Sequence, residues 1–125
     1  MDYSVVLVFE MYLGQITNSS EPETTLTRAF SLPCVPFVGL TVEFPREEPP
    51  SRDYQEAVRD AERGRMTVEG GVFTVEKVSF WVGTRTRPGA WSVTCTQNYN
   101  LRDDLRSVAR QLQTGFDFEV SDEAG

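Results

Sequence analysis

Basic and aromatic side chains gather around one predicted hairpin tip. Arg85 and Arg87 lie in the turn sequence Arg85–Gly89, and Trp81 and Trp91 flank that turn. Guanidinium groups form paired hydrogen bonds with carboxylates and phosphates, and tryptophan often anchors protein interfaces. The spacing therefore indicates a contact surface for an acidic or phosphorylated partner. In the alternative interpretation, the two tryptophans are cross-strand partners in the core.

A second row of arginines is predicted on one helix. Arg102, Arg106 and Arg110 follow one another at intervals of four, so they share one helical face. In the functional interpretation, this row converges with the hairpin tip on one partner. In the alternative, the row is solvated and Arg106 pairs with Asp103, one turn earlier. The candidate binding residues are Arg85, Arg87, Trp81, Trp91, Arg102 and Arg106.

Catalytic chemistry has little support in this sequence. The chain has no histidine, which excludes Ser-His-Asp and Cys-His nucleophiles and every zinc site that uses imidazole. The carboxylate pair Glu47-Glu48 lies in a proline-rich linker, and Asp103-Asp104 suits the start of a helix. We therefore predict no catalytic residue, no metal site and no cofactor, and a non-enzymatic protein is favoured.

The net charge indicates the kind of binding partner, and the two cysteines indicate the cellular compartment. The net charge is −7, which repels phosphate and argues against sequence-independent nucleic-acid binding. It favours a protein partner, with a basic surface as the candidate. No apolar run approaches the ~18 residues that cross a membrane, and the start lacks a basic signal-peptide region. We expect a cytoplasmic protein without membrane contact, with Cys34 and Cys95 unbridged and Cys95 in the core.

The clearest secondary-structure signal runs from Gly71 to Gln113. Phe73–Thr84 is apolar and β-branched, and Trp91–Tyr99 alternates between apolar and polar residues, so both are predicted strands of a hairpin. A helix follows with Asn100 as its N-cap. We expect this helix to cover the hairpin. Its predicted buried face consists of Leu101, Leu105, Val108, Ala109 and Leu112.

Five further strands and one further helix complete the predicted pattern. A helix over Arg52–Arg63 begins at the cap Ser51 and ends at Gly64, and Gly70-Gly71 is a predicted hairpin turn. The result is an α+β fold, a mainly antiparallel sheet of about six or seven strands with two helices, in the order β-β-β-α-β-β-β-α-β. We expect one domain over residues 1–120 and a short acidic tail over 121–125. The further strands are Tyr3–Leu13, Leu26–Leu32, Val38–Phe44, Met66–Glu69 and Phe116–Val120.

Three functional hypotheses follow from the sequence. The leading one is a small acidic protein-binding domain of the inhibitor, immunity factor or adaptor type. The second is a small-ligand-binding or catalytic domain with an anion site at Gln97–Asn100, where a helix start offers free backbone donors. The third is a structural subunit of a homo-oligomer that docks through the proline-broken edge Leu32–Val38. The alternative for Leu32–Val38 is a buried corner between strands.

Overall fold

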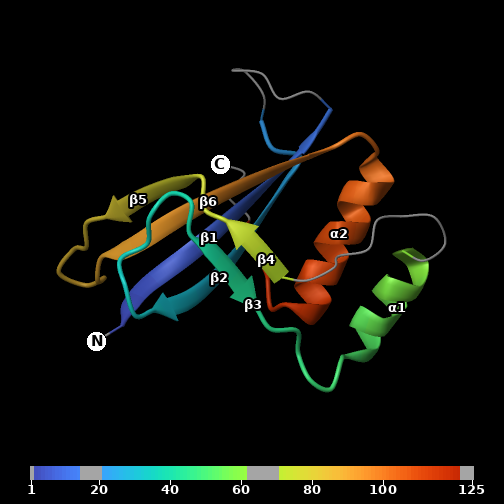
Figure 1. Cartoon of the computed structure of the whole chain (residues 1–125), viewed down its shortest axis with the longest axis horizontal. Coiled ribbons are helices and arrows are strands. Elements are labelled where there is room, and N and C mark those ends of the chain that lie inside the picture. The colour runs from blue at the N-terminus through green and yellow to red at the C-terminus, as the bar shows by residue number, and fades with distance from the viewer. Residues whose placement is uncertain (1, 15–20, 62–70, 122–125) are drawn as a thin grey trace.

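The computed structural model describes residues 2–14, 21–61 and 71–121, and Figure 1 shows the path of the chain. These ranges hold seven strands and two helices, so the predicted α+β class is confirmed, and the order of element types broadly agrees with the prediction. The elements are β1 (Tyr3–Leu13), β2 (Thr24–Leu32), β3 (Thr41–Phe44), α1 (Arg52–Ala61), β4 (Gly71–Thr74), β5 (Lys77–Trp81), β6 (Ala90–Tyr99), α2 (Arg102–Gly115) and β7 (Glu119–Val120).

Five of the strands form the main sheet, in the order β5-β6-β1-β2-β7. Three of its four strand pairs are antiparallel, which confirms the predicted main pairing. The pair β1–β6 is parallel, with Leu7 opposite Val93, and this departs from the prediction. A tight turn forces neighbouring strands to be antiparallel, but β1 and β6 are separated by most of the chain, so no turn constrains them.

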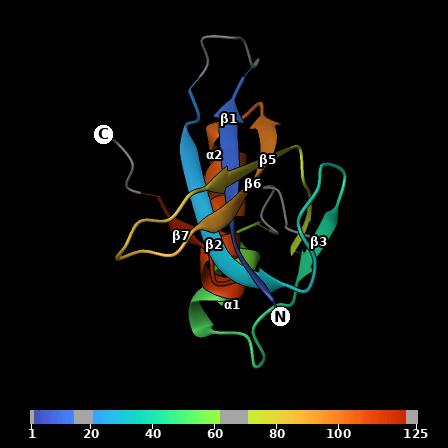
Figure 2. The same cartoon turned by 90° about the vertical axis from the view of Figure 1, so that its left-hand side faces the viewer.

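β3 and β4 form a separate two-stranded sheet, which Figure 2 shows to one side of the main sheet. The predicted single strand Phe73–Thr84 is therefore wrong, because it ends at Thr74 and resumes at Lys77 in the other sheet. The Glu76 N–H donates to the carbonyl of Thr94, whose strand partner is Lys77. Glu76 and Lys77 thus both lie opposite Thr94. This arrangement is a β-bulge, and it redirects the chain from the small sheet to the main sheet.

Other predicted boundaries shift or lie outside the described residues. The strand predicted from Val38 begins only at Thr41, and the final strand shortens to Glu119–Val120. Gly71 belongs to β4, so a turn that includes it is wrong. The predicted strand Met66–Glu69, together with residues 64 and 70, lies outside the described ranges.

The core lies between the main sheet and the elements that cover one of its faces. Phe9 of β1 contacts Phe73 of β4, with ring centroids 5.0 Å apart. Phe44 of β3 contacts Phe118, with ring centroids 5.6 Å apart. These edge-to-face contacts join the small sheet, the main sheet and the segment after α2 into one apolar cluster.

α2 buries most of its predicted apolar face. Leu105, Val108, Ala109 and Leu112 are buried, as predicted. Leu101 is the N-cap instead of Asn100 and is 62% exposed. Its extended backbone, with φ −117° and ψ 135°, takes it off the helical face, so its predicted burial is wrong.

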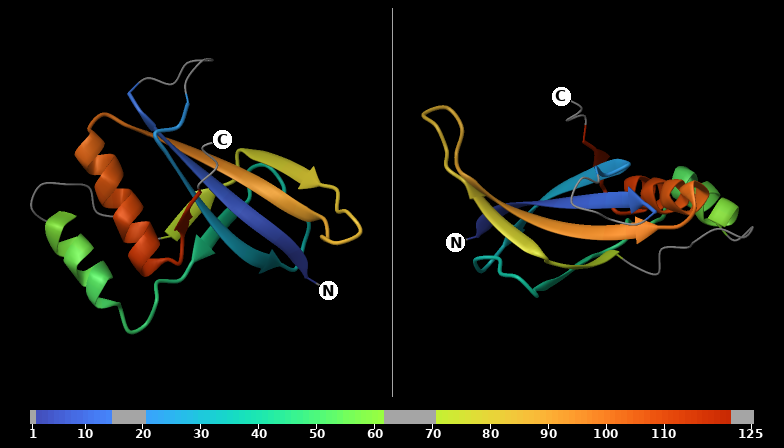
Figure 3. Two further views of the ribbon diagram at one scale, coloured as in Figure 1. Left: turned by 180° about the vertical axis from the view of Figure 1, so that it is seen from behind. Right: turned by 90° about the horizontal axis from the view of Figure 1, so that it is seen from above.

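The two helices pack side by side at one end of the main sheet (Figures 1 and 3). α1 begins as predicted, because the Tyr54 N–H donates to the hydroxyl of Ser51 at 3.1 Å. α2 contacts β1 and β6, and the β5–β6 turn lies at the opposite end of β6. α2 therefore packs against β6 of the predicted hairpin, as expected, but lies away from the hairpin turn. Neither described helix is long and apolar enough to cross a membrane.

Candidate functional site

The β5–β6 hairpin places its two tryptophans on opposite faces of the sheet. Phe80 lies opposite Trp91 and Trp81 lies opposite Ala90, because the connecting segment fixes this register. Side chains alternate along a strand, so Trp81 and Trp91 cannot be cross-strand partners, and that interpretation is wrong. Trp91 instead contacts Phe80, with ring centroids 4.7 Å apart, and is partly buried against the core.

Trp81 is available at the surface. Its side chain is 44% exposed, and the guanidinium carbon of Arg87 lies 5.4 Å from its ring centroid. This distance is within the range of a cation–π contact. Trp81 and Arg87 are therefore in contact at the surface, and their role in binding stays a prediction.

Internal hydrogen bonds fix the turn that carries the arginines. The Thr84 N–H donates to the Arg87 carbonyl at 2.8 Å, and the Arg87 N–H donates to the Thr84 hydroxyl at 3.2 Å. Gly83 and Gly89 allow the two sides to approach closely, since a Cβ on Gly83 would lie 2.5 Å from the Arg87 carbonyl oxygen. Arg85 and Arg87 are exposed on this ordered turn, and ordering a loop before binding lowers the entropy lost on binding.

Three consecutive large apolar side chains are exposed beside the turn. Phe80 is 50% exposed and Val82 is 75% exposed, with Trp81 between them. Residues 77–101 contain Lys77, Arg85 and Arg87 but no acid, a charge of +3, while the rest of the chain carries −10. The hairpin is therefore a basic and apolar surface on an acidic protein.

The arginines of α2 do not join this surface. β6 is ten residues long, which corresponds to about 30 Å, and the turn and the start of α2 lie at its two ends (Figure 1). Arg102 pairs with Glu23 at 3.3 Å, and Arg110 pairs with Asp60 of α1 at 2.9 Å. These ion pairs favour a structural role for Arg102 and Arg110. Arg106 lies between them in the row and lines a hollow between the two helices.

That hollow has a volume of about 330 Å³. Its lining includes Asp60, Asp103, Arg106 and Arg110. Because cations and carboxylates alternate there, the hollow has no excess charge for an ionic ligand.

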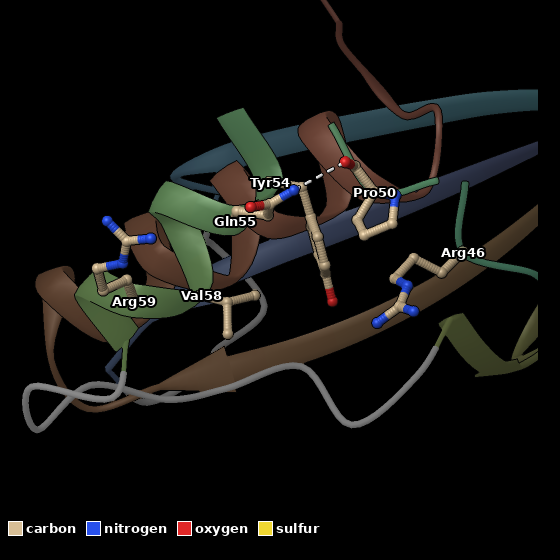
Figure 4. A pocket seen from close by; sticks show the side chains of 6 residues that line it. All are labelled: Arg46, Pro50, Tyr54, Gln55, Val58 and Arg59. Carbon is tan, nitrogen blue, oxygen red and sulfur yellow. Dashed lines mark hydrogen bonds between the residues drawn. The ribbon is translucent and has the colours of Figure 1, made fainter. Parts of the chain in front are cut away.

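A further hollow lies between the linker after β3 and α1, and Figure 4 shows its lining. Its volume is about 360 Å³, and Arg46 and Tyr54 point into it. Arg46 is already paired with Glu48 at 2.7 Å, and the Gln55 amide donates to the Pro50 carbonyl at 3.1 Å. Arg46 and Gln55 therefore already have partners within the chain, which leaves fewer groups for a ligand to satisfy.

The anion site predicted at Gln97–Asn100 gains no support from its surroundings. The Asn98 amide donates to the Gly14 carbonyl at 2.7 Å, so this side chain is already engaged. The first turn of α2 carries Asp103 and Asp104, which oppose an anion there.

The edge Leu32–Val38 is not a buried corner, because Val35, Phe37 and Val38 are exposed and only Pro36 is buried.

The two cysteines are unbridged, with Cys34 exposed and Cys95 buried, as predicted. Burial raises the pKa of the Cys95 thiol to about 11, and Glu76 contributes to the increase. Within the described ranges, no group of three His, Cys, Asp or Glu side chains could hold a metal ion.

Comparisons with protein-family models, with curated proteins and with solved structures find no match for this chain. Its function is therefore inferred from the geometry of the hairpin.

Proposed function

We propose that this protein is a non-enzymatic protein-binding domain whose contact surface is the β5–β6 hairpin. The observation that carries the proposal is the run of exposed Phe80, Trp81 and Val82 beside an ordered arginine turn. Tryptophan and arginine contribute most to the binding energy of many protein interfaces. Exposed apolar groups grouped in this way are typical of interaction sites.

The charge of the hairpin favours an acidic or phosphorylated contact region on the partner. Arg85 and Arg87 provide guanidinium groups for paired hydrogen bonds, and residues 77–101 have no carboxylate to compete. The acidic remainder of the chain suits a partner whose surrounding surface is basic, as the net charge predicts. The proposed compartment is the cytoplasm, since an exposed free thiol such as Cys34 persists where thiols stay reduced.

Site-specific photo-cross-linking in native cell extract tests this proposal. A benzophenone amino acid at Val82 should capture a discrete protein band, and the same group at the exposed Arg52 of α1 should not. The double substitution Trp81→Ala and Arg87→Ala should remove the band, because it deletes the aromatic and basic contacts together. Identical bands from both positions, or no band from Val82, would contradict a binding role for the hairpin.

A further inference from the structure

We propose that the hairpin takes an extended acidic segment of another protein, which adds to the free edge of β5 as a sixth strand of the main sheet. This inference rests on the proposed binding function of the hairpin. β5 is the outermost strand on one side of the sheet, and Figure 1 shows it at that edge. An edge strand presents backbone donors and acceptors that another chain can pair with.

The register identifies which backbone groups of β5 face outward. The Thr94 carbonyl accepts from Glu76, so the backbone of Thr94 faces β5. Backbone groups alternate in direction along an antiparallel pair. The partners of Thr94, Ser92 and Ala90 therefore face β6, and these are Lys77, Ser79 and Trp81.

It follows that Val78 and Phe80 direct their N–H and carbonyl groups to the free edge. Among the described residues, neither of them bonds to another segment on that side. The neighbouring part of β6 differs, because the Glu76 carboxylate accepts from the Thr96 N–H and from its hydroxyl. The chain thus blocks the edge of β6 with a side chain. Just before β5, the backbone of Val75 is paired with Gly39 and Leu40, so the open part of the β5 edge begins at Val78.

Charge favours an acidic segment for this edge. Lys77 stands at one end of β5, and Arg85 and Arg87 lie beyond the other end. At ~3.3 Å per residue, the five residues of β5 span about 13 Å between their first and last Cα atoms. The expected segment therefore has about five β-branched or apolar residues with acids on both flanks.

A second copy of β5 fits this edge poorly. A parallel, in-register pair of two copies would set Lys77 opposite its counterpart, and like charges opposed across strands are destabilising. An antiparallel pair centred on Ser79 would set Lys77 opposite Trp81, so neither arrangement gives the basic groups an acidic partner. The segment therefore comes from a different protein.

The test uses a fluorescein-labelled peptide of sequence EEVTVTVEE and fluorescence anisotropy. We expect saturable binding that weakens with salt, and no binding of the basic counterpart KKVTVTVKK. Two further peptides carry backbone N-methyl groups, which remove N–H donors. One is methylated at the three valines and the other at the two threonines. Because only one alternate set can face β5, one methylated peptide should bind like the parent and the other should lose affinity at least tenfold.

Matched protein variants locate the contact. The double variant Arg85→Glu and Arg87→Glu should weaken the parent peptide at least tenfold, whereas Arg52→Glu with Arg59→Glu, the same charge change on α1, should not. No binding at millimolar peptide, equal binding of both methylated peptides, or tighter binding of oligothymidylate would each overturn strand addition. A partner still captured from Val82 in those cases would leave the hairpin as the binding surface, so the two proposals fail separately.

Discussion

Cys34 and Cys95 differ in both properties that govern thiol reactivity, access and ionisation. Cys34 is exposed in the segment after β2, whereas Cys95 faces the core from β6. The raised pKa of Cys95, about 11, keeps this thiol protonated at neutral pH. At pH 8, we therefore expect Ellman's reagent to modify one thiol of the native protein and two in denaturant. The Cys34→Ser variant should lose the native reaction, and two fast thiols in the native wild type would contradict the buried position of Cys95.

Because of Tyr99, the free energy of unfolding should depend on pH in the alkaline range. Burial raises its pKa from 10.0 to about 12, so the folded state holds this proton more tightly than the unfolded state does. This stabilisation is fully present below pH 10 and is lost as the pH rises toward 12. We expect the urea midpoint to fall between pH 10 and 12, and to fall less in Tyr99→Phe. An equal fall in both proteins would show that Tyr99 is not the cause.

Gly115 allows the two helices to touch. A Cβ at this position would lie 2.3 Å from a ring carbon of Tyr54, which is itself buried. Gly115→Ala should therefore destabilise the fold by about 1–3 kcal/mol, although alanine favours helices. Chemical denaturation would measure this, with the exposed Gln113→Ala on the same helix as control. In a Tyr54→Ala background the cost should largely disappear, and its persistence there would exclude the ring contact as the cause.

At the scale of elements, the period of apolar residues predicted most of the strands and helices. β1 has the predicted bounds, and α2 buries four of its five predicted apolar residues. The wrongly predicted boundaries lie where tertiary contacts determine the path of the backbone. The long apolar strand divides at Glu76 because a bulge moves the chain between two sheets, and alternation continues across that point with no local signal.

The start of α2 gives a test of this difference between pattern and packing. Leu112 is buried in the core, and Leu101, which has the same helical period, is mostly exposed. Leu112→Ala should cost about 2–5 kcal/mol, the usual range for a buried leucine. Leu101→Ala should change the free energy of unfolding by no more than about 0.5 kcal/mol. Equal costs, measured by urea unfolding, would mean that Leu101 is buried after all.

For the whole molecule, one apolar cluster joins residues of both sheets and both helices. The single domain over residues 1–120 stays a prediction, and for it we expect one cooperative unfolding transition. The tryptophans report on the hairpin, and far-ultraviolet circular dichroism reports mainly on the helices. Their thermal midpoints should coincide. Separate midpoints would show that the hairpin end and the helical end unfold independently.

The sequence by itself determined the local structure and the residues available for chemistry. The period of the apolar residues predicted the buried face of α2. The composition showed a chain without histidine, and the turn sequence predicted a hairpin tip with two arginines. These properties depend on residues near one another in the chain, so a pattern can reveal them.

Only the tertiary structure decided how these parts meet. It made β1 and β6 parallel, placed Trp81 and Trp91 on opposite faces, and put the arginines of α2 at the far end of β6 from the turn. It also left β5 at an edge. Each of these outcomes depends on which strands pair and in which register. Pairing is a contact between distant residues, whose free energy depends on the whole core and leaves no local mark on the sequence.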